Sequence, residues 1–499
     1  MIQSAFMRRY VWAGAAMVLL GAWAPAASLQ AQPSSQAKYV FLMIGDGMGQ
    51  GQRTAAEIYL AGPQEPGRPP RVKPLVMNTL PVAGMMRTYS ADSLITDSAA
   101  AATAMATGQK APNGVVCLDV SSGRMLATLA EIAAAQGRKI GIVSTAAIDD
   151  ATPACFYAHV SRREKAYDIS MQLSASGMDY FAGGRPDGIM PQEVQLRPSP
   201  LEAARKSGYT ILTQRQELLA LKKGAGKVLM YWPPLEDPTP ANPAPGATSQ
   251  PAQAEQEPPP PPPPSLAEMT RKGIELLDQP AGFFMMIEGG EIDGYCHQHD
   301  LHGAIRETLE FDKAVAEALE FYKKHPQETL IVVLADHETG GLGLGNTGRD
   351  ALVNLYKVVS GQPEQSSAFN KKVLEFRKNK TTFEAALPAI TEFFGLENVS
   401  GQQAKLLAAA YGESMKDPKD RLKDEAFKDL YGSFDPLTTA CSNLVSRKAG
   451  VSWTTYSHTG VSVPVTAIGA GSERFAGYYE NTEVFEKLLA AMSLSPRAK

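Results

Sequence analysis

Three short, continuous apolar runs in this chain are each followed by an acidic residue, either directly or after one further residue. They are residues 39–44 before Asp46, residues 283–287 before Glu288, and residues 330–334 before Asp336 and His337. A continuous apolar run of this length is typical of a strand that is buried on both faces of a parallel sheet. In open α/β sheets the active site lies at the carboxyl ends of the strands, so the three acids are expected at one edge. Such acids would repel one another unless cations lay between them, and the pattern therefore predicts a site for several metal ions.

The rest of the chain alternates between strand-like and helix-like segments. Strands are predicted at residues 38–46, 139–145, 282–288, 328–336 and 463–470, and helices at residues 125–136 and 305–324. With 499 residues, 44% of them hydrophobic, the chain can bury a large core. Alternating strands and helices predict an α/β fold with a central, largely parallel sheet flanked by helices.

Two segments interrupt this alternation. Residues 233–264 are rich in Pro, Ala and Gln, cannot build a core, and are expected to form a disordered or polyproline-like loop. Residues 346–452 are charged and helical in pattern, and are expected to be a helical insertion that caps or flanks the site. Because candidate metal residues lie on both sides of the Pro-rich segment, we favour a single domain over residues 36–499 rather than two domains joined by a linker.

The N-terminus has the pattern of a secretory signal peptide. Arg8 and Arg9 precede a short apolar stretch at residues 11–23, and small residues follow, which suits cleavage after Ala27 or Ala31. The alternative is an uncleaved membrane anchor, but the stretch is shorter than the roughly 20 residues that span a bilayer. The sequence therefore predicts a signal peptide at residues 1–31, a periplasmic or secreted location, and no stable membrane insertion of the mature protein.

Charge and cysteine usage narrow the possible partners and cross-links. The formal net charge of −4 is near balance and no basic block is present, so nucleic acid is not expected as a partner. Four cysteines in an exported protein allow two disulfides with three connectivities, and the sequence does not choose among them. The four are Cys117, Cys155, Cys296 and Cys441.

A serine precedes a run of very small residues in the first third of the chain. Thr96, Asp97 and Ser98 are followed by mostly Ala up to Gly108, which predicts the start of a tightly packed helix. A helix N-terminus offers free N–H groups and a positive dipole to an anion, so Ser98 could be a nucleophile toward a phosphoryl group. The alternative is a serine that merely caps the helix, and this segment taken alone favours the cap.

Six motifs spread through the chain closely resemble, in order, those of the alkaline phosphatase family. They occupy residues 44–49, 96–100, 150–154 with 159–163 behind it, 288–293, 335–341 and 457–460. The resemblance spans the mature chain except for the Pro-rich segment, and is weak over residues 346–452. It implies an extracytoplasmic phosphatase that acts on small phosphate monoesters through a phosphoserine intermediate, and a homodimer is compatible with it.

The resemblance also implies a ligand set for two zinc ions and one magnesium ion. The first zinc would be held by Asp293, His297 and His458, the second by Asp46, Asp336 and His337, and magnesium by Asp46, Thr152 and Glu288 with Asp150 beside it. Mixed nitrogen and oxygen ligands suit zinc, and oxygen ligands alone suit magnesium. Ser98 would be the nucleophile. Arg163, rather than its neighbour Arg162, would hold two phosphoryl oxygens in its planar fork.

One position departs from the family pattern. Where relatives carry a larger side chain after the aspartate that corresponds to Asp293, this chain has Gly294, so a contact to phosphate is missing or is replaced by Tyr295. The remaining histidines are expected to be structural, solvated or adjacent to the site. They are His159, His299, His302 and His325.

Two other functions compete with the phosphomonoesterase. A metal-dependent phosphodiesterase could use the same scaffold, but an arginine that grips two non-bridging oxygens suits a dianionic monoester better. A protein that only binds metal or phosphate would not need the nucleophile Ser98.

Overall fold

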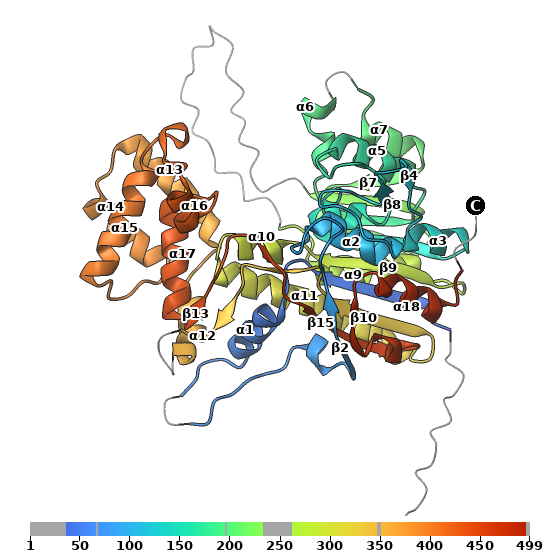
Figure 1. Cartoon of the computed structure of the whole chain (residues 1–499). Helices are drawn as coiled ribbons and strands as arrows, with labels where there is room; N and C mark the ends of the chain where they lie inside the picture. Colours follow the sequence, from blue (N-terminus) through green and yellow to red (C-terminus); the bar gives the residue numbers. More distant parts are fainter. Residues whose placement is uncertain (1–35, 66–67, 195–196, 233–261, 347–350, 496–499) are drawn as a thin grey trace, which may run out of the picture. The chain divides into compact units, whose positions relative to one another are not determined.

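The computed structural model describes residues 36–65, 68–194, 197–232, 262–346 and 351–495 (Figure 1). The predicted signal peptide at residues 1–31 and most of the Pro-rich segment, residues 233–261, lie outside the described residues. Within the described part of the chain, no helix is both long enough and apolar enough to cross a membrane.

A ten-stranded sheet forms the centre of the molecule, in the order β16-β2-β15-β10-β1-β9-β5-β6-β8-β7. The seven strands from β10 to β7 run parallel to one another. Strand β15 is antiparallel to both β10 and β2, and β16 is parallel to β2. The strands are β1 (Tyr39–Gly45), β2 (Val82–Arg87), β5 (Lys139–Ala147), β6 (Tyr180–Gly184), β7 (Tyr209–Leu212), β8 (Lys227–Trp232), β9 (Phe283–Gly289), β10 (Thr329–Leu334), β15 (Val463–Gly469) and β16 (Gly477–Glu480). The predicted α/β class, with a largely parallel sheet, is confirmed.

Three short two-stranded sheets accompany the main one. They pair β3 (Leu118–Asp119) with β4 (Arg124–Met125), β11 (Glu338–Thr339) with β14 (His458–Thr459), and β12 (Gly343–Leu344) with β13 (Val451–Ser452). The last two pairs bring together segments that lie more than a hundred residues apart in the chain. One of them carries His458, and the other joins the two ends of the predicted helical insertion.

Helices connect and cover the strands. The first group is α1 (Gln50–Leu60), α2 (Ser98–Thr107), α3 (Leu129–Ala135), α4 (Ala151–Ala154), α5 (Ala166–Ala175), α6 (Pro191–Val194), α7 (Pro200–Lys206), α8 (Arg215–Ala220), α9 (Leu266–Leu277), α10 (Glu291–His297), α11 (Leu301–Lys324) and α18 (Glu483–Met492). Strands β1, β9 and β10 are buried along their whole lengths, which requires side-chain cover on both faces of the sheet. This burial is why their sequences read as unbroken apolar runs.

The register of the central strands brings their carboxyl ends level with one another. Ile44 of β1 lies opposite Glu288 of β9 on one side and opposite Leu334 of β10 on the other. Asp46 and Asp336 each follow two residues after these positions, so all three acids reach the same edge of the sheet. This is the arrangement that the three apolar runs predict.

Residues 351–448 form a helical segment with a small core of its own. Its helices are α12 (Leu355–Ser360), α13 (Asn370–Asn379), α14 (Phe383–Phe393), α15 (Gly401–Ser414), α16 (Glu425–Tyr431) and α17 (Pro436–Lys448). Phe369, Phe376, Ile390, Leu407 and Val445 pack together at its centre. Figure 1 draws these helices in orange.

All four cysteines are buried free thiols in this structure. Cys117 and Cys155 are neighbours, because the Cys117 thiol donates to the Cys155 carbonyl at 3.0 Å and both sulfurs contact Thr103 Oγ1. Burial raises the pKa of Cys117 well above its usual value, which keeps it protonated. The two disulfides that the sequence allowed are not formed here.

Candidate active site

Three buried carboxylates meet at the carboxyl edge of the sheet. Asp46 is 3% exposed, and Glu288 and Asp336 are fully buried. Burial, followed by the charges of neighbouring carboxylates, raises the pKa of Asp46 well above its usual range. Burial and nearby acids also raise the pKa of Glu288 to about 8, and burial together with Asp293 raises that of Asp336 to about 7. The carboxylates would thus resist ionisation unless cations compensated them.

Four buried oxygens at this edge have no hydrogen-bond partner among the described residues. They are Asp46 Oδ1, Thr152 Oγ1, Glu288 Oε1 and Asp336 Oδ2. Buried polar atoms in proteins are nearly always paired, so four such atoms in one cluster require a specific explanation. The oxygens belong to the residues expected to hold the second zinc and the magnesium, and this donor set fits divalent cations.

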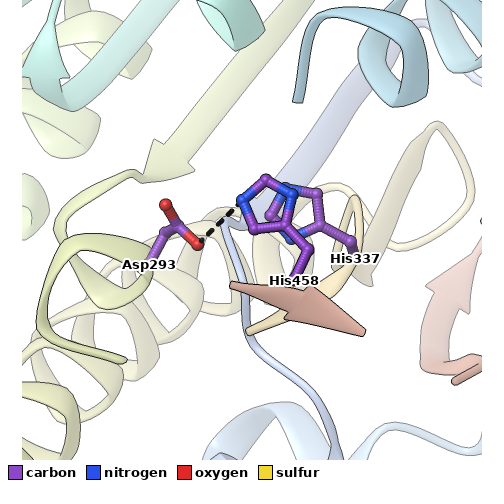
Figure 2. Close-up of side chains that lie close together, drawn as sticks. All are labelled: Asp293, His337 and His458. Atoms are coloured by element: carbon purple, nitrogen blue, oxygen red, sulfur yellow. Dashed lines mark ion pairs between the residues drawn. The ribbon is translucent and has the colours of Figure 1, made fainter. Parts of the chain in front are cut away.

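The residues expected to hold the first zinc converge from helix α10 and from strand β14, which lies far away in the sequence. Asp293 and His297 lie four residues apart on α10, with Asp293 Oδ2 3.1 Å from His297 Nε2. His297 Nε2 is 3.2 Å from His458 Nε2, which lies 3.7 Å from Asp293 Oδ1. Figure 2 shows Asp293 and His458 turned toward one another, with His337 directly behind.

Both zinc-candidate histidines of this group are oriented through their other ring nitrogen. His297 Nδ1 donates to the Tyr456 carbonyl at 2.7 Å, and His458 Nδ1 donates to the Thr96 carbonyl at 2.8 Å. A proton on Nδ1 leaves the lone pair on Nε2, which is the form of imidazole that binds a metal. The two Nε2 atoms therefore face each other as acceptors, an arrangement that a cation between them would stabilise.

His337 lies between the two zinc-candidate groups. Its Nε2 is 3.5 Å from Asp46 Oδ1 and 3.3 Å from Asp336 Oδ2, and its ring stacks on that of His458 with centroids 3.7 Å apart. Donor atoms of Asp46, Asp336 and His337 lie close enough together for one ion, and so do those of Asp293, His337 and His458. Burial and the neighbouring His458 lower the pKa of His337 well below its usual value, so the ring stays neutral.

The magnesium-candidate residues lie directly after β1, in β9 and in α4. Thr152 on α4 is fully buried beside Glu288, and its hydroxyl offsets part of the rise in the pKa of the Glu288 carboxyl. The Thr152 hydroxyl nevertheless has no well-aligned hydrogen-bond partner among the described residues. Ser144 on β5 donates to the other oxygen of Glu288. Sequence reasoning did not single out Ser144, because only the register of β5 against β9 places it opposite Glu288.

Ser98 is the first residue of α2 and does not cap the helix. The capping residue is Asp97, whose side chain accepts from the backbone N–H of Ala100 at 3.0 Å. The Ser98 hydroxyl is therefore not engaged in capping and lies 3.2 Å from His337 Nε2. Its side chain thus points from the positive end of a helix into the cluster of candidate metal ligands.

Arg163 lies close to Ser98 in the structure, because it contacts Asp97, the residue before Ser98. Its guanidinium contacts Asp97 Oδ2 at 3.3 Å and Asp150 Oδ1 at 3.0 Å. Burial would lower the pKa of Arg163, but Asp150 and Asp97 outweigh it and raise the pKa overall, so the group stays charged. The adjacent Arg162 is exposed and pairs with Glu164 instead.

The other histidines lie outside the cluster, each with its own partners. His159 Nε2 contacts Glu131 Oε1 at 3.0 Å, and His302 Nδ1 contacts the Val359 carbonyl at 2.9 Å. His299 is buried rather than solvated, with only 4% of its surface exposed. The Thr339 hydroxyl donates to Asp293 Oδ1. Sequence reasoning did not single out Thr339, although it lies within the motif at residues 335–341.

Gly294 lies in the middle of α10 with open space beside it. A Cβ atom placed there would meet only Glu291 Oε2, at 3.7 Å, which is an ordinary van der Waals contact. The backbone is helical, so a larger residue would fit without strain.

Comparison with known proteins gives a consistent result. The sequence model of one family, alkaline phosphatase, matches residues 37–195 and 197–494. Among curated relatives, the chain is 37% identical to streptomycin-6-phosphate phosphatase of Streptomyces griseus over 66% of this chain and 80% of the relative. It is 29% identical to alkaline phosphatase 4 of Bacillus subtilis over 92% of this chain and 89% of the relative.

Solved structures show the same fold. The cold-active alkaline phosphatase of a psychrophilic Shewanella superposes with a TM-score of 0.70 at 25% identity, covering 91% of this chain and 99% of that one. The alkaline phosphatase of Thermus thermophilus gives a TM-score of 0.73 at 22% identity and covers 96% of each chain.

Proposed function

Because this chain belongs to the alkaline phosphatase family, and is thereby a phosphomonoester hydrolase, we propose that it acts through a phosphoserine intermediate on Ser98 with two zinc ions and one magnesium ion. The observation that carries this proposal is the Ser98 hydroxyl, which lies 3.2 Å from His337 Nε2 beside a cluster of buried, unpartnered ligand oxygens. A residue that served only to cap a helix would have no reason to point there.

The proposed ligand sets follow the donor chemistry of the residues. Nitrogen and oxygen donors of Asp293, His297 and His458 suit one zinc, and those of Asp46, Asp336 and His337 suit the other. Oxygen donors of Asp46, Thr152 and Glu288 suit magnesium. When bound, such ions supply positive charge that lowers the pKa of a serine hydroxyl or a water molecule and stabilises the leaving oxygen.

The remaining chemistry belongs to side chains of the protein. Ser98 Oγ forms a bond to phosphorus while the ester bond to the leaving alcohol breaks, and water then cleaves the phosphoserine to release orthophosphate and restore Ser98. The two N–H groups of the Arg163 fork suit two non-bridging oxygens of the phosphoryl group. Asp97 and Asp150 hold that fork in place through contacts of 3.3 and 3.0 Å. The N-terminus of α2 adds its positive dipole on the side of Ser98.

A comparison of two aryl esters tests this function. The protein should hydrolyse an aryl phosphate monoester about 100-fold faster or more, in kcat/KM, than the matching bis-aryl diester, because the diester cannot present the dianionic group that Arg163 recognises. Faster cleavage of the diester would identify a phosphodiesterase instead. Saturable binding of metal and phosphate without cleavage of either ester would identify a binding protein.

Export through residues 1–31 is part of the proposal, and it rests on the signal-like order of basic, apolar and small residues there. An extracytoplasmic phosphatase would act on small phosphate monoesters outside the cytoplasm.

Replacing Gly294 with lysine should strengthen the binding of phosphate. A charge-assisted contact from the new ammonium group, formed directly or through water, would lower the inhibition constant of inorganic phosphate by about tenfold or more. The new contact would stabilise bound phosphate product as much as the transition state. The turnover number should therefore stay unchanged, or fall if release of phosphate limits the rate. Inhibition constants for the parent and Gly294→Lys provide the measurement.

Two further variants control this prediction. Gly294→Ala removes the flexible glycine from α10 without adding a charge, and should leave the inhibition constant near that of the parent. Glu291→Gln combined with Gly294→Lys removes the nearest competing carboxylate, whose Oε2 lies 3.7 Å from the new Cβ position. If neither lysine variant binds phosphate better than Gly294→Ala does, position 294 does not face the phosphate.

A further inference from the structure

Thr339 lies at the junction of the two groups of zinc-candidate residues, although it belongs to neither. Its side chain is fully buried. Its hydroxyl contacts Asp293 Oδ1 of the first group and, at 3.2 Å, His337 Nδ1 of the second. In the two-stranded sheet of β11 and β14, Thr339 is also the residue paired with His458. A single hydroxyl therefore bridges one candidate ligand of each zinc ion.

The backbone of Thr339 fixes the place of this hydroxyl. The Thr339 N–H donates to the Gly47 carbonyl at 3.1 Å, and the Thr339 carbonyl accepts from the side-chain amide of Gln52 at 2.9 Å. Gln52 is itself buried, with 1% of its surface exposed. Hydrogen bonds on both sides of the residue thus keep the hydroxyl beside Asp293 and His337.

The chemistry of the two side-chain contacts fixes their direction. An ionised carboxylate can only accept, so the single proton of the Thr339 hydroxyl goes to Asp293. The hydroxyl oxygen can then only accept from His337, which requires a proton on Nδ1 of that ring. In a neutral imidazole a proton on Nδ1 leaves the lone pair on Nε2, the form that binds a metal. His337 Nε2 is the atom that lies 3.2 Å from the Ser98 hydroxyl.

We propose that Thr339 is a positioning residue, which holds Asp293 in place and selects the tautomer of His337 that carries its proton on Nδ1. The opposite tautomer would set two lone pairs against each other, on His337 Nδ1 and on Thr339 Oγ1. Thr339 would thereby prepare both zinc-candidate groups through one hydroxyl. The proposal rests on the phosphatase function above, because it concerns the ligands named there.

Nuclear magnetic resonance of the metal-free protein measures the tautomer directly. Imidazole nitrogens labelled with ¹⁵N give well-separated signals with and without a proton, and comparison with His337→Gln identifies the signals of this ring. In the neutral ring of the parent, Nδ1 should carry the proton. Thr339→Val replaces the hydroxyl with a methyl group of similar size and should lose this preference. Thr339→Ser keeps the hydroxyl and should retain the preference.

Zinc affinity provides a second readout. In competition with a chromogenic chelator, Thr339→Val should bind zinc about tenfold or more weakly than the parent, the scale on which the loss of a ligand's hydrogen-bond partner weakens a metal site. Thr339→Ser should bind zinc as the parent does. The kcat/KM for an aryl phosphate should fall in Thr339→Val and recover in Thr339→Ser.

Thr459→Val separates this role from general support of the sheet. Thr459 belongs to the same two-stranded sheet, but its hydroxyl donates to Glu338, which is not a candidate ligand. This variant should keep the parental tautomer and zinc affinity even if both valine variants melt at lower temperature.

Three results would overturn the proposal. They are a proton on Nε2 of His337 in the parent, a Thr339→Val variant that keeps the parental tautomer or zinc affinity, and an equal loss of zinc affinity in Thr459→Val. A parent that shows the expected tautomer but binds no zinc would instead count against the metal-dependent phosphatase itself, because the tautomer is measured without metal.

Discussion

Ser98→Ala is expected to lose turnover by about a thousandfold or more, the scale on which enzymes lose rate when a nucleophile is deleted. The Ser98 hydroxyl lies at the start of α2 and is free to act as a nucleophile toward phosphorus, because Asp97 rather than Ser98 caps the helix. Some activity should remain, since the dipole of α2, Arg163 and bound metal ions would still polarise the phosphoryl group for direct attack by water.

Three measurements check this expectation. Steady-state turnover of an aryl phosphate gives the loss, and mass spectrometry of acid-quenched parent enzyme should find phosphate on Ser98. Thermal unfolding of Ser98→Ala should match that of the parent, because the hydroxyl supports no structural hydrogen bond within the helix cap. Ser122→Ala, an exposed serine in the turn between β3 and β4, serves as the matched control and should retain full turnover. Full turnover in Ser98→Ala would rule out the covalent mechanism.

Removal of metal ions is expected to abolish activity. Elemental analysis of purified protein should find about two zinc ions and one magnesium ion per chain, as the ligand inventory requires. Exhaustive chelation should then reduce turnover to background, and addition of zinc and magnesium together should restore it. Full activity in a protein with no bound metal would refute the assignment of these carboxylates and histidines.

Metal removal should also make stability depend on pH in a defined direction. Folding raises the pKa of Glu288 from 4.5 to about 8 and that of Asp336 from 3.8 to about 7. A carboxyl whose pKa is higher in the folded state binds more protons when folded, so the free energy of unfolding falls as pH rises between those values. The metal-free protein should therefore lose stability from about pH 4 to pH 8, by on the order of several kcal/mol in total.

Bound cations should cancel most of this loss, because they stabilise the ionised carboxylates. The informative quantity is the difference in melting temperature between metal-loaded and metal-free protein, which should grow as pH rises from 5 to 8. This difference removes the contribution of acids away from the cluster, such as Glu307, whose pKa burial raises to about 7. A difference that stays constant or shrinks across this range would mean that Glu288 and Asp336 do not hold the ions.

The sequence alone was sufficient for the class of fold and the edge of the sheet that carries the site. Buried parallel strands need apolar side chains on both faces, so the sequences of β1, β9 and β10 are unbroken apolar runs. The carboxyl ends of neighbouring parallel strands lie at the same edge of the sheet. The proximity of Asp46, Glu288 and Asp336 could therefore be predicted from the sequence. The family motifs then supplied the expected roles of Ser98 and Arg163.

Other features depended on contacts between residues far apart in the chain, and local sequence does not encode such contacts. Whether Ser98 or Asp97 caps α2 depends on which side chain reaches the Ala100 N–H, and both residues are common caps. The Nδ1 partners of His297 and His458 are carbonyls 159 and 362 residues away, so only the folded chain fixes which ring nitrogen faces a metal. The burial of His299 likewise arises where α17 meets the loop before His458. Periodicity along the chain reports which face of an element is buried, whereas tertiary packing alone decides which distant groups share one site.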